Sequence, residues 1–250
     1  MFVVRTIWVF GDQLNRGIGA LRDADPAEDR ILMVESLGKI TSKRWHRQRA
    51  HFVVASMRRF AAELADAGFD VDYRRSDSMR RGALDHMAQF EPDELIATEP
   101  ASWDGRNLVR SLGAHVTTTV VTSNQFLCHY DEFAEWADGK KRFKMEDFYR
   151  WQRKRLGYLM EPGTDEPAEG RWNFDDENRE PPPKPGTEGD AWPEPQQSAL
   201  DDLDAAVLDD LDAAAERSGT ELWGAPPDGT RATSRRAAMA RHRHFVDKEL

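Results

Sequence analysis

The sequence predicts an α/β protein with a five-stranded, doubly wound parallel sheet, followed by a helical and loop-rich C-terminal extension. Short apolar runs alternate with amphipathic helical patterns over the first 121 residues. This alternation favours right-handed crossovers and a parallel sheet that is covered on both faces. A stretch rich in Pro and acidic residues follows, and two further helical patterns complete the chain. The expected segments are an α/β domain at 1–130, a basic helical segment at 131–158, a linker at 159–197 and a helical segment at 198–250.

The expected strands are short runs of apolar and β-branched residues. They lie at 5–10, 30–35, 69–74, 94–98 and 115–121. A long helix is expected from about residue 42 to residue 66, because apolar residues recur there every three or four positions, and Gly68 ends it. Shorter helices are expected at 18–21, 78–90 and 103–112.

The second half of the chain is less regular. After an irregular link, helical patterns continue to residue 158, and the long loop that follows contains Pro181-Pro-Pro-Lys-Pro185. An amphipathic helix is expected at 198–218, with Ser198 as its N-cap and Gly219 at its end. The last helical pattern, 231–250, has no stop signal. We therefore interpret 198–250 as the start of a domain that the chain does not complete.

Composition limits the classes of protein. A chain of 250 residues with 39% hydrophobic residues and eight Trp is expected to bury a sizeable core. The single Cys128 excludes internal disulfides and any metal or iron–sulfur site built from several cysteines, and no histidine spacing indicates a metal site. No apolar run approaches the roughly 20 residues that span a bilayer, and no signal peptide opens the chain, so a cytoplasmic protein is expected.

Charge is distributed unevenly. The formal net charge is -10, yet residues 140–155 carry eight Lys/Arg and four aromatic residues. Cations neutralise phosphates and aromatic rings stack on bases, so this basic block is a candidate DNA-binding site. The expected DNA contacts are Lys140, Lys141, Arg142, Lys144, Arg150 and Arg153. The alternative is an ordinary surface helix with solvated charges and a buried aromatic stripe.

Polar residues follow the first two strands of the predicted sheet. Gly11, Asp12 and Gln13 come after the first strand, and Glu35 and Ser36 after the second. Doubly wound sheets bind ligands outside the carboxyl ends of their strands, where the strand order reverses. Glycine permits a tight turn, and Asp and Gln offer hydrogen bonds to a heteroaromatic ligand. The alternative is that Asp12 only caps a helix and Glu35 is solvated. Neither a dinucleotide fingerprint nor a nucleophile-elbow motif occurs.

Several motifs occur together in an order that is similar to one family. They are Trp8-Val-Phe-Gly-Asp-Gln-Leu14, Met33-Val-Glu35, His46-Arg-Gln-Arg-Ala-His-Phe52, Ser56-Met-Arg-Arg-Phe60, Thr98-Glu-Pro-Ala-Ser-Trp103, Met145-Glu-Asp-Phe-Tyr-Arg150, Gly170-Arg-Trp-Asn-Phe-Asp175 and Glu177-Asn-Arg179. From about residue 4 to residue 250, the chain resembles the amino-terminal part of the deoxyribodipyrimidine photolyase-related proteins. These include iron–sulfur bacterial cryptochromes and (6-4) photolyases.

The resemblance implies an antenna-like, Rossmann-like domain that binds a ribityllumazine chromophore beside the first strand. Gly11, Asp12, Gln13 and Glu35 match that region, and Val53 matches a position near the chromophore. With Phe10 as apolar wall and Ser36 after Glu35, the candidate set is Phe10, Gly11, Asp12, Gln13, Glu35, Ser36 and Val53. The family often has an acid where this chain has Lys39.

The resemblance also implies a helical domain that holds FAD and repairs UV-damaged DNA with light. Family members are far longer, and their flavin pocket and cluster cysteines lie in that carboxyl-terminal domain. We therefore expect this chain to lack the iron–sulfur cluster and most or all of the FAD site. The expected function is light-dependent DNA repair, with UV-damaged or single-stranded DNA as partner. The alternatives are a non-catalytic light sensor or antenna module, one half of a split photolyase completed by a second polypeptide or oligomer, and an inactive remnant.

Overall fold

A computed structural model of the chain describes residues 4–173 and 195–248. These residues form two compact units. The first consists of 1–125 together with 195–250, and the second of 126–194. The proline run at 181–185, the motif Glu177-Asn-Arg179 and most of the expected linker lie outside the described residues.

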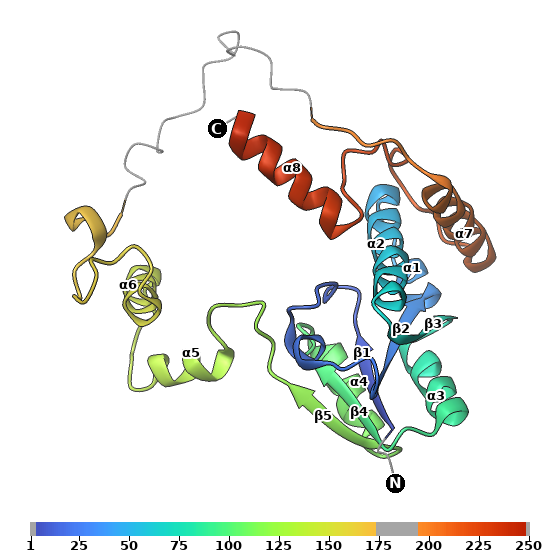
Figure 1. Cartoon of the computed structure of the whole chain (residues 1–250), viewed down its shortest axis with the longest axis horizontal. Helices are drawn as coiled ribbons and strands as arrows, with labels where there is room; N and C mark the ends of the chain where they lie inside the picture. The colour runs from blue at the N-terminus through green and yellow to red at the C-terminus, as the bar shows by residue number, and fades with distance from the viewer. Residues whose placement is uncertain (1–3, 174–194, 249–250) are drawn as a thin grey trace. The chain divides into compact units, whose positions relative to one another are not determined.

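The first unit is built on a five-stranded, all-parallel sheet (Figure 1). Its strands are β1 (Arg5–Val9), β2 (Asp29–Ser36), β3 (Asp70–Ser76), β4 (Glu94–Thr98) and β5 (Thr117–Val121). The spatial order is β3-β2-β1-β4-β5. Strand order therefore reverses at β1, which pairs with β2 on one side and with β4 on the other. This arrangement confirms the predicted doubly wound α/β fold.

Alternate residues of the central strands bury the two faces of the sheet. Ile7 and Met33 pack on one face against α2 (Arg47–Asp66) and the short 3-10 helix η1 (Gly19–Asp23). Trp8 and Leu32 pack on the other face against α3 (Met79–Phe90) and α4 (Trp103–Leu112). Strands covered on both faces read as continuous apolar runs, which is why the sequence revealed them.

The predicted helix at 42–66 is wrong at its beginning. A short helix α1 (Leu37–Thr41) comes first, and α2 begins only at Arg47. Trp223 keeps the residues between α1 and α2 out of a helix, because its carbonyl accepts from Arg47 N at 2.8 Å and its backbone N–H donates to Trp45 O at 3.1 Å. The His46 ring then caps α2 by accepting from Gln48 N.

The helix α7 (Asp202–Ser218) packs on α2 through an apolar seam. Ala50 and Val54 of α2 meet Val207 and Leu211 of α7. Gly219 ends the helix in the left-handed conformation, at φ 65, as predicted.

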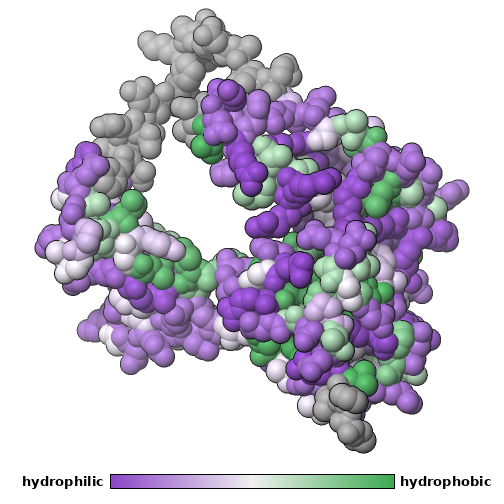
Figure 2. Space-filling view, viewed as in Figure 1, coloured by the Kyte–Doolittle hydropathy of each residue, from purple (hydrophilic) through white to green (hydrophobic). Residues whose placement is uncertain are grey.

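The predicted N-cap Ser198 is wrong for α7. The cap is Asp201, whose carboxylate accepts from the backbone of Leu203 and Asp204. Ser198 instead pairs with a later segment of the chain, since its backbone N–H donates to Gly229 O at 3.0 Å. The last helix is α8 (Arg235–Lys248), shorter than the predicted 231–250. Hydrophilic side chains dominate its visible face (Figure 2).

The second unit contains α5 (Tyr130–Ala137), α6 (Met145–Leu156) and the 3-10 turn η2 (Ala168–Gly170). Aromatic side chains form its centre, with ring centroids 5.1 to 6.3 Å apart. They are Phe133, Trp136, Phe143, Phe148 and Trp151. Such ring pairs add stability beyond the area that they bury, which lets a small unit hold together with few aliphatic residues.

Candidate functional site

A hollow of about 460 Å³ lies at the carboxyl ends of β1, β2 and β4, where strand order reverses. We call it the switch-point hollow. Its size falls within the range of about 300–1,000 Å³ that is typical of small-molecule sites. Six of the seven predicted ligand residues line it, namely Phe10, Gly11, Asp12, Glu35, Ser36 and Val53. The fold therefore brings together residues from two strand ends and the facing helix.

Gly11 sets how closely the loop after β1 approaches α2. A side chain there would place its Cβ 3.0 Å from the Met57 sulfur and 3.7 Å from Val53 Cγ1. The first distance is tighter than an ordinary Cβ contact, so the Met57 side chain would have to move by a few tenths of an ångström to admit a larger residue. Glycine therefore lets the loop approach Met57 and Val53 of α2 closely.

Gln13 does not line the switch-point hollow. Its side chain is buried, and its amide nitrogen donates to the carbonyls of Thr98 at 3.2 Å and Glu99 at 3.3 Å. These bonds tie the loop after β1 to the end of β4. Gln13 therefore positions the wall of the hollow, and its hydrogen-bonding capacity is used inside the protein.

Glu35 is buried and already has partners for its carboxylate. Arg58 donates to its two oxygens at 2.9 Å each, Tyr73 donates at 2.7 Å, and Arg75 lies at 3.4 Å. Although burial opposes ionisation, the hydrogen bonds and charge of Glu35 raise the pKa of the Arg58 guanidinium. Burial, reinforced by the Glu35 charge, raises the pKa of the Tyr73 phenol, which therefore donates as a neutral group. The expected alternative of a solvated Glu35 is wrong.

Ser36 also has a local role. Its hydroxyl caps α1 by accepting from Lys39 N at 3.2 Å, and it donates to Asp77 O at 3.5 Å. The side chains of Asp12 and Val53 make no such internal bonds in the part of the chain that the structure describes. Of the predicted set, Phe10, Asp12 and Val53 are therefore the side chains that remain available to a ligand in the hollow.

Sequence reasoning missed several residues that line the switch-point hollow. Trp45 comes from the segment between α1 and α2, and Arg49 from the first turn of α2. Ser102 is the N-cap of α4, and Asp104 lies in its first turn. The motif at 98–103 was a usable signal, because it follows β4 and β4 is the other neighbour of β1. Arg49 was harder to find, since its position depends on where α2 begins.

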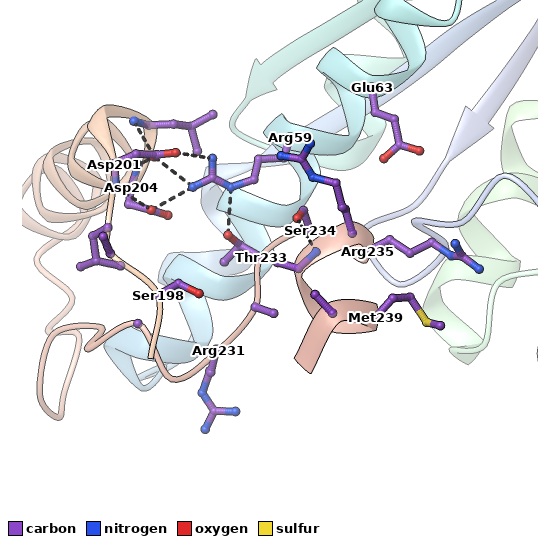
Figure 3. Close-up of a pocket in the computed structure, with 18 of the residues that line it drawn as sticks. Arg59, Glu63, Ser198, Asp201, Asp204, Arg231, Thr233, Ser234, Arg235 and Met239 are labelled. Atoms are coloured by element: carbon purple, nitrogen blue, oxygen red, sulfur yellow. Dashed lines mark hydrogen bonds and ion pairs between the residues drawn. The ribbon is translucent and has the colours of Figure 1, made fainter. Parts of the chain in front are cut away.

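A second hollow, of about 1120 Å³, lies between α2, the start of α7 and the segment that leads into α8. Arg59 projects from α2 into it and contacts Asp201, Asp204 and Thr233 (Figure 3). The Nη2–Asp204 distance is 2.8 Å and the Nε–Thr233 distance is 2.9 Å. Because these contacts join helices of the same unit, we regard the second hollow as a structural junction.

The basic block belongs to the second unit. Lys140, Lys141, Arg142 and Lys144 are exposed, and Lys140 lies 4.9 Å from the centroid of the Trp136 ring. Arg150 is also exposed and pairs with Glu146 at 2.9 Å, one helical turn away. These five cations are accessible to solvent, as a phosphate contact requires.

Arg153, the sixth expected DNA contact, has a different environment. It is only 4% exposed, and its guanidinium donates to the carbonyls of Tyr158, Leu159 and Trp172. It thereby fixes the loop after α6. Trp136 is buried as well, whereas Phe143 is exposed. The second unit thus combines features of both sequence interpretations, a solvated set of cations and a partly buried aromatic cluster.

Within the described residues, no helix has the length and apolarity needed to cross a membrane. The same residues bring together no group of three or more His, Cys, Asp or Glu that would hold a metal ion.

The fold and the switch-point hollow define a doubly wound α/β protein with a candidate ligand site at its strand reversal. Residues 7–220 match the model of the deoxyribodipyrimidine photo-lyase-related protein family, so the chain belongs to that family. A (6-4) photolyase from Agrobacterium fabrum (strain C58) is 33% identical over 186 residues. That match covers 70% of this chain and 36% of the relative, so the chain spans little more than a third of the length of the relative.

Proposed function

We propose that this photolyase-related chain takes part in light-dependent repair of UV-damaged DNA, with an aromatic chromophore in the switch-point hollow and DNA at the basic block. Membership of the family supports the class of activity. The observation that carries the proposal is the position of the hollow, because six residues selected for chromophore binding line one cavity at the strand reversal.

The residues of the hollow suit a small aromatic heterocycle such as ribityllumazine. Phe10 and Val53 supply apolar walls, and Asp12 offers carboxylate oxygens to ring N–H donors. When bound, the lumazine would supply absorption of violet light. The protein's part is to hold the ring in a fixed orientation and to exclude water from its faces.

Repair by electron transfer requires a cofactor that carries the electron. Cys128 is the one cysteine of the chain, and an iron–sulfur cluster takes four thiolate ligands. The residues of this chain do not fit such a cluster. We assign chromophore and DNA binding to this chain, and a flavin supplied by a further polypeptide or domain would act as the electron donor.

The first test is a fluorescence titration of the protein with ribityllumazine. We expect wild type to bind and Val53→Trp to lose binding, because the larger ring fills the hollow. The matched control is Ala65→Trp, which adds the same ring at an exposed position of α2 that lines no part of the hollow. Overpacking at Val53 costs about 1–3 kcal/mol, so melting curves must accompany the titration. Failure of wild type to bind, or equal binding by Val53→Trp, would contradict the proposal.

A non-catalytic chromophore carrier is the second candidate function. It is favoured by one observation: every residue that lines the switch-point hollow belongs to the first unit, between Phe10 and Leu108. The lining of the hollow is thus supplied by residues of the first unit. Binding of ribityllumazine without any affinity for DNA would favour this candidate over a role in repair.

A further inference from the structure

We propose that the ligand of the switch-point hollow is an aromatic heterocycle that carries an anionic group, a phosphate ester on its side chain. This inference rests on the proposed chromophore-binding role of the same hollow. It comes from two cations in the lining, Lys39 and Arg49, that the packing of the described residues leaves without a carboxylate partner.

Arg49 differs from the other arginines of α2. Arg47 pairs with Asp212 at 3.0 Å, Arg58 with Glu35 at 2.9 Å, and Arg59 with Asp201 at 3.0 Å. Among the residues that the structure describes, Arg49 has no ion-pair partner, and its guanidinium instead lies 4.4 Å from the centroid of the Trp45 ring. It is also the one arginine of α2 that lines the switch-point hollow.

Lys39 reaches the same hollow from α1. The Ser36 hydroxyl accepts from its backbone N–H at 3.2 Å and so fixes the start of the helix. The side chain is exposed and has no ion-pair partner within the described parts of the chain. Two unpaired cations, one of them stacked on an aromatic ring, form a cationic portion of the lining. Arg and Lys at such positions are the side chains that recognise phosphate.

The acidic residues of the hollow do not cancel these cations. Glu35 is neutralised by Arg58 and Arg75. Asp12 and Asp104 come from the loop after β1 and the first turn of α4, and neither forms an ion pair with Lys39 or Arg49. The unpaired carboxylates of the hollow therefore come from the loop after β1 and from α4, and the unpaired cations come from α1 and α2. A ring with N–H donors and an attached phosphate satisfies both, whereas a neutral ligand leaves the cations to solvent.

The test compares ribityllumazine with its 5′-phosphate, which differ only in the phosphate group. We expect the phosphate ester to bind at least about tenfold more tightly to wild type, the gain that one or two charge-assisted hydrogen bonds provide. Lys39→Ala with Arg49→Gln should remove this advantage, so that the double variant binds the two compounds with equal affinity. Arg49→Lys, which keeps the charge, should retain part of it. Lys43→Ala is the matched control, because Lys43 is an exposed cation of the same region that does not line the hollow.

The outcomes separate this inference from the proposed function. Equal affinity for the two compounds, or an advantage that persists in the double variant, would overturn the anionic ligand and leave the chromophore site intact. Binding of neither compound would overturn the chromophore site itself, and the phosphate inference with it. Melting curves of each variant show that the sheet and α2 remain folded during the measurement.

Discussion

His51 Nε2 of α2 lies 3.1 Å from Asp204 Oδ1 of α7, and both side chains are at least 96% buried. Burial of two ionisable groups is costly unless their charges are compensated. The compensation here is Arg59, whose guanidinium lies 2.8 Å from the second oxygen of Asp204. The α7 helix is therefore held on α2 by a buried polar junction beside its apolar seam.

The acids of this junction come from a duplicated unit. Leu-Asp-Asp-Leu-Asp-Ala-Ala occurs at 200–206 and again at 208–214. The first copy supplies Asp201 and Asp204 to Arg59, and the second supplies Asp210 to Arg58 and Asp212 to Arg47. Much of the acidic charge of α7 is thus paired with arginines of α2. The repeat serves helix docking, which a purely solvated acidic face would not do.

The buried histidine predicts a dependence of stability on pH. Burial lowers the pKa of His51 below its ordinary value of 6.5, and this effect outweighs the attraction of Asp204. Below 6.5 the unfolded chain binds a proton that folded His51 resists, so the free energy of unfolding should fall with falling pH down to the folded pKa. Above pH 6.5 His51 is neutral in both the folded and the unfolded state, so its effect on the free energy of unfolding no longer changes with pH. Thermal melts across this window measure the slope.

The control for this prediction is a pair of matched substitutions. His51→Gln should flatten the dependence by up to about 1.4 kcal/mol per pH unit, the contribution of one proton. His242→Gln removes an exposed histidine and should leave the slope unchanged. Equal slopes in wild type and His51→Gln would show that His51 is not the titrating group.

The apolar seam between α2 and α7 predicts a large effect of truncation. Leu211 is fully surrounded at this seam, and Leu211→Ala should lower the free energy of unfolding by about 2–5 kcal/mol, because it removes buried methyl groups and leaves a cavity. Leu200→Ala makes the same chemical change at an exposed position of the preceding segment and should cost no more than about 0.5 kcal/mol. Denaturant titrations of both variants decide whether α7 contributes to the stability of the first unit.

The buried ion pair of Glu35 predicts that substitution of this residue lowers the stability of the fold, which distinguishes it from a residue that only contacts a ligand. Glu35→Gln would leave Arg58 without its buried partner, and we expect a reduction of about 3–5 kcal/mol in the free energy of unfolding. Asp210→Asn weakens the same network at a more exposed carboxylate and should cost less. If Glu35→Gln instead retained full stability and abolished only ribityllumazine binding, Glu35 would touch the ligand and would not be a structural residue.

The fold was predictable from the sequence because its strands are local signals. The runs at 5–10 and 30–35 are rich in apolar residues, and no distant residue is needed to recognise them. The errors arose at helix boundaries that are set by distant hydrogen-bond partners. Trp223 bonds to the backbone before α2, and Gly229 accepts from the backbone N–H of Ser198 before α7. Both interactions join segments that are far apart in the sequence.

The candidate site shows the same limit. Position at or just after the end of a strand was enough to gather Gly11, Asp12 and Glu35 at one cavity. It was not enough to assign their roles, since the partners of Glu35 come from α2 and β3. Arg153 was selected for its charge, and only the folded second unit shows that its donors are used by backbone carbonyls. Pattern identifies where polar groups gather, and packing decides which of them remain free.

The basic block predicts salt-dependent binding of DNA through its exposed cations. Charge reversal at Lys140, Lys141 and Arg142 should weaken binding to UV-irradiated and undamaged single strands alike, because phosphates carry no sequence information. The slope of log affinity against log salt should become shallower by about 0.7 for each phosphate of a single strand that the variant no longer neutralises. Reversal of Arg22, Lys43 and Arg81, three exposed cations of the first unit, is the matched control and should leave the slope unaltered. Affinity that does not respond to salt, or that falls equally in the control, would show that DNA is bound elsewhere or not at all.

Arg153→Ala should lower the melting temperature of the protein, because the carbonyls of the loop after α6 would be deprived of their donor.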